Sequence, residues 1–493
     1  MTPEVPAGRG GSGMTSEVPA PCDGPGVPPE VPATRDLVGG VWGDCGDDLG
    51  FDLEDPATGE PRRRALGSSP GRVEAALAAA ERAAAAWADT PGPRRASLLE
   101  EAARALAERA GEIVRLESFA TGVPIRQAAP LGMIVHGAFA LAAAQVREGL
   151  LLSVRDAVEV HRLPWGPALC LVPWNAPAPM AAHKAASALA AGCPVIVKVS
   201  EYAPHGTQVL AEVLHEVLPP GVFQLVHGGP RTGALLAGDP RIRAVSFTGG
   251  LLGGRSVAMA CAAGLRPAQL ELGGNNPLVV MPDAGTGAAA DAAAELLTTL
   301  NGQWCRALGR LIVPRARLGE LLEATGERLA ALRTGDPLAD GTEFGPLVHS
   351  AHLRRVRDAV AGAGGRATAY GDMPDKGNFL APTLITGADL ADEIFGPVAA
   401  VVPYDTVEEA LTLANATPYG LEGYVVGGDE ERALALARRI RAGEVKVNGS
   451  SVMSLHLFTP RPAWGLSGLG EEGTAETIRF FTGARVVGVQ GSP

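Results

Sequence analysis

The chain has 493 residues, too many for one ordinary hydrophobic core, so we expect two or three domains. Hydrophobic residues make up 46% and charged residues 19%, which is typical of a soluble globular protein. A net charge of −12 without a basic block argues against nucleic acid as the main partner and against a polybasic membrane anchor.

The cellular compartment is predicted from apolar runs and cysteine usage. No apolar run reaches the roughly 18 residues of a membrane-spanning helix, so we expect no membrane span. The N-terminus is rich in proline and glycine and lacks the apolar core of a signal peptide, so we expect none. Six irregularly spaced cysteines favour a reducing cytoplasm over a disulfide framework.

Residues 1–35 are of low complexity. Glu-Val-Pro-Ala occurs at 4–7, 17–20 and 30–33, with a period of thirteen residues. Each repeat is too short and too rich in proline to bury a core, so we predict a disordered tail. A proline-rich docking segment is the functional alternative.

Two amphipathic helices are predicted after the tail, over 72–88 and 93–118. From residue 168, short apolar runs alternate with helical stretches, which predicts βαβ units with parallel sheets. Two such series follow one another, so the predicted fold class is α/β with two domains in tandem. The predicted strands are 168–174, 194–200, 222–228 and 244–250 in the first series, and 276–282, 310–316, 399–405, 423–428 and 445–449 in the second.

Four glycines follow the last strand of the first series and precede a helical stretch: Gly249, Gly250, Gly253 and Gly254. Glycines there let the backbone approach a phosphate, and a helix N-terminus offers free N–H donors. The spacing is not the G-x-G-x-x-G fingerprint. A tight strand-to-helix turn therefore explains the glycines as well as phosphate binding does.

Lys198 and Glu201 lie at the carboxyl end of a predicted strand, where ligands bind in doubly wound sheets. A cation there can hold a ribose hydroxyl or a phosphate, and a carboxylate can accept hydrogen bonds from the ribose hydroxyls of adenosine. The carboxylate would repel a 2′-phosphate, which favours NAD over NADP. A solvated pair on a loop is the alternative.

Three residues have the types that nucleophilic catalysis needs. Cys305 follows a Gly-Gln turn, and it is either a nucleophile or a small buried hydrophobe. Glu271 ends an apolar segment, where a desolvated carboxyl with a raised pKa acts as a general base near neutral pH. Asn175 follows a predicted strand, where its amide could donate to an oxyanion, although asparagine is commonest in turns.

Taken together, the motifs resemble those of the NAD(P)-dependent aldehyde dehydrogenase superfamily, from about residue 40 to the C-terminus. The matching motifs are, in order, PWNAP (173–177), KVSE (198–201), FTGG (247–250), ELGGNNP (271–277), GQWC (302–305), EIFGPV (393–398) and TPYGLEGYV (417–425). The separation between Glu271 and Cys305 also fits that family. The resemblance implies a Rossmann-like cofactor domain and a catalytic domain in tandem, with a β oligomerisation arm.

The resemblance implies a role for each candidate catalytic residue. Cys305 matches the nucleophile, Glu271 the base that activates the deacylating water, and Asn175 the oxyanion donor, with the backbone N–H of Cys305 as the second donor. Lys184 and Glu472 match positions of a proton relay. The implied reaction oxidises an aldehyde to a carboxylic acid with NAD(P)+ through a thiohemiacetal and a thioester on Cys305. No metal ligand is implied.

The implied cofactor is NAD, with NADP as the alternative. Lys198 and Glu201 match the contacts to the adenosine ribose, and Glu393 and Phe395 match those to the nicotinamide ribose and ring. The full set implied to bind the cofactor is Trp174, Lys198, Glu201, Gly249, Gly250, Gly254, Leu272, Glu393 and Phe395.

The resemblance also implies the domain boundaries. After the tail, the NAD-binding domain takes 36–141 and 165–270, the catalytic domain takes 271–461, and the arm takes 142–164 and 478–493. The C-terminal strand lacks a following helix, so it is a candidate for pairing with another subunit. We expect a homodimer or a homotetramer, with a small aldehyde as substrate.

The sequence departs from the family in three places. Gly250, Leu251 and Leu252 stand where the family commonly has a serine and other polar residues, so one phosphate hydrogen bond would be lost. Asn275 replaces a common lysine. Near the C-terminus, a double glycine and a lysine are lost, and Arg461 and Trp464 would reshape the substrate entrance. We therefore predict an unusual, pathway-specific aldehyde.

Two other functions stay open. A dehydrogenase that passes the acyl group to coenzyme A usually lacks the general base, and here Glu271 is present. A catalytically silent scaffold with the same fold is favoured only by the altered phosphate loop. The presence of Cys305, Glu271 and Asn175 argues against that scaffold.

Overall fold

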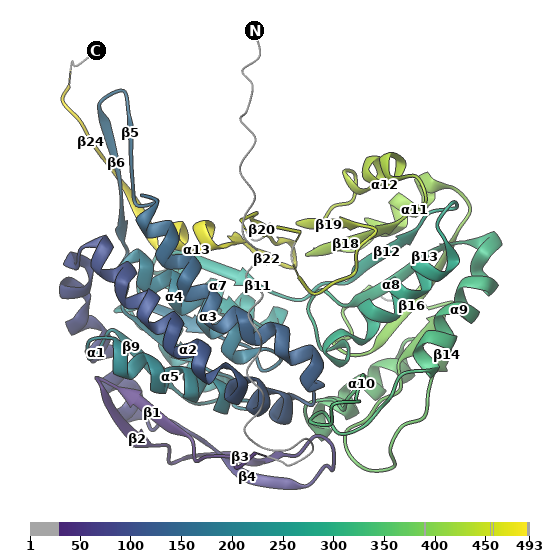
Figure 1. Ribbon diagram of the computed structural model, residues 1–493, viewed down its shortest axis with the longest axis horizontal. Helices are drawn as coiled ribbons and strands as arrows, with labels where there is room; N and C mark the ends of the chain where they lie inside the picture. The colour runs from purple at the N-terminus through teal and green to yellow at the C-terminus, as the bar shows by residue number, and fades with distance from the viewer. Residues whose placement is uncertain (1–28, 389–390, 454, 457, 491–493) are drawn as a thin grey trace.

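The computed structural model describes residues 29–388, 391–453, 455–456 and 458–490, so most of the predicted tail lies outside the described residues. Two α/β units lie beside each other, each built around its own sheet (Figure 1). A narrow three-stranded sheet projects from the first unit, at the upper left of the figure. The predicted α/β class with two tandem units is confirmed.

The first sheet has eight strands in the order β2-β1-β9-β8-β7-β10-β11-β22. The strands from β9 to β11 run parallel, and β7 and β8 are buried along their whole length. Continuous apolar strands of this kind form the centre of a sheet that helices cover on both faces. The strands are β1 (Arg35–Val38), β2 (Val41–Asp44), β7 (Ala168–Leu171), β8 (Val195–Lys198), β9 (Phe223–Val226), β10 (Ala244–Thr248), β11 (Ala268–Glu271) and β22 (Gly468–Leu469).

Two helical layers cover the first sheet, and each layer has its own apolar core. One layer consists of α2 (Gly92–Thr121), α3 (Ile125–Arg147), α4 (Pro177–Ala191) and α5 (His205–Val217). The other consists of α1 (Pro70–Asp89), α6 (Pro230–Gly238) and α7 (Leu251–Ala263). A hairpin of β3 (Asp47–Glu54) and β4 (Pro61–Gly67) lies outside the sheet.

The second sheet has seven strands in the order β14-β15-β16-β13-β12-β18-β19, parallel except for the edge pair of β14 and β15. Helices again alternate with the strands, as the apolar pattern predicted. The elements are β12 (Asn276–Val280), α8 (Thr286–Thr298), β13 (Leu308–Pro314), α9 (Leu318–Ala330), α10 (Ser350–Gly362), β14 (Arg366–Ala369), β15 (Thr383–Thr386), β16 (Val398–Tyr404), α11 (Val407–Ala414), β18 (Glu422–Val426), α12 (Glu430–Ala437) and β19 (Glu444–Val447).

The chain returns to the first sheet after it has built the second. The short strand β22 pairs antiparallel with β11, with Leu469 opposite Leu270 and Gly468 opposite Glu271. The strand β20 (Arg461–Pro462) precedes it, and β23 (Glu471–Glu472) and α13 (Thr474–Phe480) follow. This crossing brings the C-terminal segment beside Glu271.

The projecting sheet consists of β5 (Leu152–Arg155), β6 (Val158–Pro164) and β24 (Thr482–Val487), the two segments predicted for the arm. The C-terminal strand is not a lone strand within the chain, because β24 pairs antiparallel with β6 from Thr482 to Val487. The outer edges of β24 and β5 have no strand beside them within the described residues.

Among the described residues, one helix, α3, is long and apolar enough to cross a membrane. A single helix of this kind is weak evidence for a membrane span, since the core helices of globular proteins have the same composition. α3 packs between α2 and α4, and its Val135 and Phe139 are fully buried. These contacts bury 33% of the most apolar stretch of α3.

Candidate active site

Asn175 and Glu271 lie at the carboxyl ends of strands of the first sheet, whereas Cys305 lies before a strand of the second. Asn175 follows β7, Glu271 ends β11, and Cys305 lies between the short helix η1 (Thr299–Gly302) and β13. Glu472 reaches the same region because β22 pairs with β11. Ligand sites of open α/β sheets form at these carboxyl ends of parallel strands.

The loop that carries Cys305 has a left-handed backbone over three consecutive residues, with φ of 50° at Leu300, 57° at Asn301 and 71° at Gly302. This conformation is unfavourable for residues other than glycine, so surrounding contacts must hold it. A Cβ on Gly302 would overlap the backbone of Pro397. Glycine is therefore required for the loop to lie against the segment before β16.

Asn301 supplies the contacts that hold this loop. Its buried Nδ2 donates to the carbonyl of Gly122 at 2.7 Å and to that of Pro346 at 2.9 Å. Its Oδ1 accepts a hydrogen bond from the backbone N–H of Gly345 at 2.8 Å. One side chain thus joins the end of α2, in the first unit, to the second unit beside the predicted nucleophile.

Gln303 fastens the next position of the loop. Its Oε1 accepts from the backbone N–H of Val348 at 2.9 Å, and its carbonyl accepts from Nδ2 of Asn175 at 2.8 Å. Asn175 therefore lies against the loop that carries Cys305. Its amide nitrogen carries a second N–H, which this hydrogen bond does not use. The sequence analysis missed the holding roles of Asn301 and Gln303, although the Gly-Gln pair before the cysteine was a signal.

Cys305 is partly exposed, whereas Cys45, Cys170, Cys193 and Cys261 are buried. Cys170, Cys193 and Cys261 belong to the apolar core, and Cys22 lies outside the described residues. Burial raises the pKa of Cys305 to about 12, and the positive charge of Arg306 opposes this. The thiol therefore needs help from its surroundings to ionise near neutral pH.

Glu271 is a buried carboxyl whose Oε1 has no hydrogen-bond partner among the described residues. Burial and the neighbouring charge of Glu472 raise its pKa to about 8, against the opposing charges of Arg306, Lys184 and Arg461. A carboxyl with this pKa exchanges a proton close to neutral pH, as a general base must.

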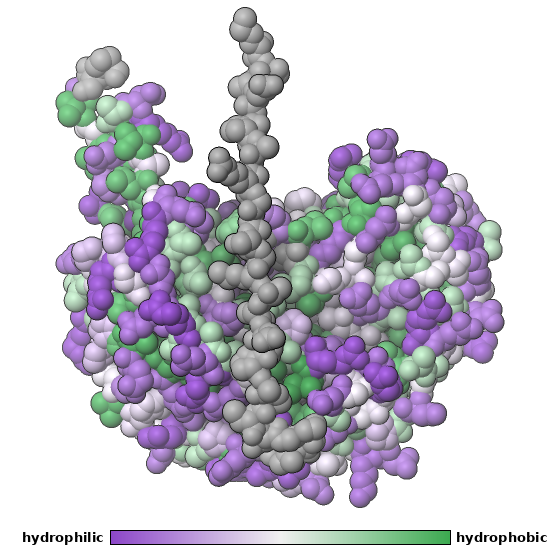
Figure 2. Space-filling view, viewed as in Figure 1, coloured by the Kyte–Doolittle hydropathy of each residue, from purple (hydrophilic) through white to green (hydrophobic). Residues whose placement is uncertain are grey.

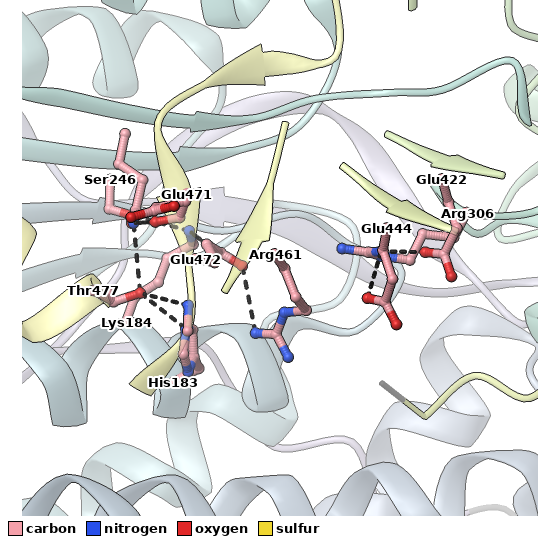
Figure 3. Close-up of polar contacts among 12 residues, drawn as sticks. His183, Lys184, Ser246, Arg306, Glu422, Glu444, Arg461, Glu471, Glu472 and Thr477 are labelled. Atoms are coloured by element: carbon pink, nitrogen blue, oxygen red, sulfur yellow. Dashed lines mark hydrogen bonds and ion pairs between the residues drawn. The ribbon is translucent and has the colours of Figure 1, made fainter. Parts of the chain in front are cut away.

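Lys184 and Glu472 form a buried ion pair, with Nζ 2.6 Å from Oε1 (Figure 3). Lys184 also donates to Oγ of Ser246 at 2.8 Å, and Arg461 lies 4.0 Å from Oε2 of Glu472. Burial alone would raise the pKa of Glu472, but Lys184, with His183 and Arg461, lowers it to about 2. Glu472 is thus a fixed negative charge beside Glu271.

Glu393 and Phe395 lie on the segment before β16. Oε1 of Glu393 accepts from the backbone N–H of Gly274 at 3.1 Å, and a Cβ on Gly273 would overlap the carboxylate. The ring of Phe395 meets that of Trp174 edge to face, with centroids 5.4 Å apart. Burial raises the pKa of Glu393 to about 7. The structure thus brings together three of the residues predicted to bind the cofactor.

Lys198 and Glu201 form a pair, with Nζ 3.4 Å from Oε2. Their side chains are only 10% and 13% exposed, so the alternative of a solvated loop pair is wrong. Burial lowers the pKa of Lys198, and Glu201 opposes that change.

The glycine-rich segment forms the turn from β10 into α7, with Gly250 as the N-terminal cap and without a side-chain cap. The first backbone N–H groups of the helix are therefore available to an anion. The hydroxyl of Thr248, at the end of β10, is buried without a hydrogen-bond partner among the described residues. Leu252 is 80% exposed, so it offers neither a hydrogen bond nor core packing.

Packing explains part of the glycine pattern. A Cβ on Gly249 or Gly253 would press on the ring of Phe247, and one on Gly254 would press on the side chain of Leu272. The predicted cofactor residues Gly254 and Leu272 are thus in direct contact with each other.

Replacing Gly302 with alanine should misplace the loop that carries Cys305. The left-handed backbone alone costs alanine about 1–2 kcal/mol, and the overlap with Pro397 adds to this. We expect a lower Tm and a lower kcat for Gly302→Ala. As control, Gly362→Ala places its Cβ in open space at the end of α10 and should leave both values unchanged. If Gly302→Ala had the same Tm and kcat as Gly362→Ala, glycine would not be required at position 302.

Comparison with known proteins identifies the family. The model of the aldehyde dehydrogenase family matches residues 42–487. Betaine aldehyde dehydrogenase of Cereibacter sphaeroides is 35% identical over 458 residues, which cover 89% of this chain and 93% of the relative. The 3-succinoylsemialdehyde-pyridine dehydrogenase of a Pseudomonas species is 34% identical over 440 residues, which cover 85% and 91%.

Solved structures agree with the sequence relatives. A mutant of aldehyde dehydrogenase C from Pseudomonas syringae, in complex with NAD+ and octanal, has a TM-score of 0.88 at 30% identity, covering 92% of this chain and 96% of that one. An aldehyde dehydrogenase of Mycobacterium tuberculosis in complex with NAD+ has a TM-score of 0.87 at 32% identity, covering 92% and 97%. The chain therefore belongs to the aldehyde dehydrogenase family, NAD-dependent enzymes that oxidise aldehydes to carboxylic acids.

Proposed function

We propose that Cys305 is the nucleophile of this reaction, that Glu271 is its general base, and that Asn175 stabilises the oxyanion. The observation that carries the proposal is their common location. Cys305 shares a loop with the carbonyl that Asn175 binds, and the charge of Glu271 acts on its thiol.

Residues of this chain can carry out each step of the oxidation and of the deacylation. The thiolate of Cys305 forms a bond to the aldehyde carbon, and the alkoxide accepts hydrogen bonds from Nδ2 of Asn175 and the backbone N–H of Cys305. When bound, NAD+ supplies the acceptor for the hydride that leaves this carbon, and a thioester remains. Glu271 takes a proton from water, whose oxygen attacks the thioester and releases the acid and Cys305.

Lys184 and Glu472 are proposed to pass on the proton that Glu271 receives, and Glu472, an anion at rest, holds this proton only during the transfer. Their ion pair lies close enough to shift the pKa of Glu271, and Ser246 extends the polar chain from Lys184. A proton on Glu271 can leave through such a connected set of donors and acceptors.

The first unit is proposed to bind NAD, with the boundaries 36–141 and 165–270, and the catalytic domain to take 271–461. The uncapped start of α7 and the unpartnered hydroxyl of Thr248 fit a pyrophosphate. Lys198 and Glu201 fit the adenosine ribose, and the carboxylate favours NAD over NADP. Trp174, Leu272, Glu393, Phe395 and the glycines Gly249, Gly250 and Gly254 complete the proposed set.

The substrate is proposed to be an aldehyde with an apolar body. A small cavity beside Asn175 is lined mostly by apolar side chains of α2 and α3, such as Val114 and Leu131, together with Glu117 and Thr121 of α2. At the proposed entrance, Trp464 is 49% exposed, and Arg461 pairs with Glu472. The Pseudomonas syringae relative was crystallised with octanal, an aldehyde of this kind.

The replacement Cys305→Ala tests the nucleophile. We expect wild-type protein to form NADH with a panel of aldehydes and the variant to form none, with Cys193→Ala as the matched control that keeps activity. Larger apolar aldehydes should give higher kcat/KM than short aliphatic ones. A reversed ranking would contradict the proposed substrate class.

The same assay separates the two alternative functions. Formation of a coenzyme A thioester instead of free acid would identify an acylating enzyme. A rise of Tm with NAD, without turnover of any aldehyde, would identify a silent scaffold.

The pKa of Glu271 predicts the pH dependence of deacylation. Only the carboxylate acts as a base, and with a pKa of about 8 its population grows as the pH rises towards 8. We expect the deacylation rate to rise with pH, to reach half its maximum near pH 8 and to level off above that pH. Glu271→Gln should lower the rate about 100-fold or more and remove this dependence. An unchanged pH profile in the variant would exclude Glu271 as the base.

A homodimer or homotetramer is proposed, with 142–164 and 478–493 as the arm. Apolar side chains lie along the arm (Figure 2), and Leu152, Val154 and Val486 are 49%, 62% and 67% exposed. A second exposed apolar surface lies on and after α7, where Met259 and Leu265 are 72% and 94% exposed. Exposed apolar surfaces of this kind mark protein interfaces.

A cytoplasmic location is also proposed, since it suits the free cysteines.

The double variant Val154→Glu/Val486→Glu should weaken the assembly, because it places charges on the apolar arm. Light scattering should give the mass of two or four chains for wild-type protein and a smaller mass for the variant. Arg82→Glu on α1 serves as the control and should keep the wild-type mass. A wild-type mass of one chain would overturn the proposal.

A further inference from the structure

We propose that Arg306, the residue that follows the nucleophile, is a positioning residue whose buried guanidinium stabilises the thiolate of Cys305. The inference rests on the proposed role of Cys305 and goes further, because it names the group that activates the thiol.

Two neighbouring strands hold the guanidinium in place. The side chain of Arg306 is 13% exposed and forms ion pairs with Glu422 of β18 and, at 3.5 Å, with Glu444 of β19 (Figure 3). Glu422 also pairs with Nζ of Lys446, from β19, at 2.9 Å. Parallel pairing places Glu422 opposite Glu444, so both carboxylates lie at the start of their strands.

The backbone around the nucleophile is held as firmly as the side chain. Oη of Tyr424 donates to the carbonyl of Arg306 at 2.8 Å. Nδ2 of Asn276 donates to the carbonyls of Cys305 and Ala307, at 2.9 and 2.8 Å. Hydrogen bonds thus fix three consecutive carbonyls, those of Cys305, Arg306 and Ala307.

Stability does not explain the cluster of Arg306, Glu422, Glu444 and Lys446. Each of these side chains is at most 13% exposed, so four charges are removed from water. The desolvation cost of such a cluster often equals or exceeds the gain from pairing, and apolar side chains of similar volume stabilise a protein as well or better. Arg306 directly follows Cys305 in the chain and its charge acts on the thiol, which gives the buried cluster a chemical purpose.

Four charged groups act on Cys305, and Arg306 is the strongest of them. Burial raises the pKa of the thiol most, Arg306 lowers it, and Glu393, Glu271 and Glu422 raise it. Burial raises the pKa of Glu271 to about 8 and that of Glu393 to about 7, so both carboxyls change charge near neutral pH. Burial alone would lower the pKa of Arg306, but Glu422 and Cys305 raise it above its ordinary value. Arg306 is thus a permanent positive charge beside the thiol.

The rate of alkylation of Cys305 by iodoacetamide, measured against pH by peptide mass spectrometry, tests this proposal. We expect the profile of Arg306→Gln to move to higher pH, with alkylation at neutral pH about tenfold slower, as a rise of one unit in the pKa requires. Arg306→Lys keeps the charge and should restore most of the rate. Arg315→Gln breaks an exposed ion pair with Asp405 beyond the end of β13 and should leave the profile unchanged.

A profile of folded Arg306→Gln that coincides with the wild-type profile would overturn the proposal, as would a lysine variant as slow as the glutamine variant. A lone change leaves Glu444 without its ion pair and Glu422 with Lys446 alone. The double variant Arg306→Gln/Glu422→Gln removes a buried carboxylate together with the cation and so lowers the risk of unfolding. Arg306 acts on the thiol more strongly than Glu422 does, so the double variant should also shift to higher pH.

The alkylation assay needs neither aldehyde nor NAD, so its outcome is independent of the proposed function. If the alkylation profile of Arg306→Gln does not move to higher pH, Arg306 is excluded as the activating group, even if Cys305→Ala abolishes turnover. Turnover by Cys305→Ala would exclude the nucleophile even if the shift is found.

Discussion

The hydrogen bonds of Asn301 are the constraint on which the active site depends. Three left-handed residues in succession are unfavourable, and the loop adopts them because Asn301 bonds to the carbonyls of Gly122 and Pro346 and to the N–H of Gly345. The same bonds join the two α/β units at the loop of Cys305. The hydrogen bonds that hold the left-handed backbone of this loop are therefore the same ones that join the two units.

Buried ion pairs on two sides of the site shift the pKa values of Glu271 and Cys305. On one side, Lys184 holds Glu472 as a permanent anion, which raises the pKa of Glu271. On the other side, carboxylates of β18 and β19 hold Arg306 as a permanent cation next to Cys305. The cation shifts the thiol towards the thiolate, and the anion raises the pKa of Glu271, which makes its carboxylate a stronger base.

The glycine-rich turn combines two demands on the same residues. Gly249 and Gly253 make room for the ring of Phe247, and Gly254 makes room for Leu272, so packing alone requires small residues there. The uncapped start of α7 still leaves its backbone donors available, even though Leu252 points away from the core. Backbone N–H groups do not depend on side-chain identity, so the turn keeps its donors despite the leucines.

The sequence by itself determined the α/β class, the two series of strands and the family, because alternation of apolar runs and motif order are local properties. It also singled out Cys305, Glu271 and Asn175 from their residue types and neighbours. Only the tertiary structure decided that Lys198 and Glu201 are a buried pair, that β24 pairs with β6, and that Asn301 joins the two units. Burial and pairing depend on residues far apart in the chain, such as Arg306 and Glu444, and no local pattern encodes their distance.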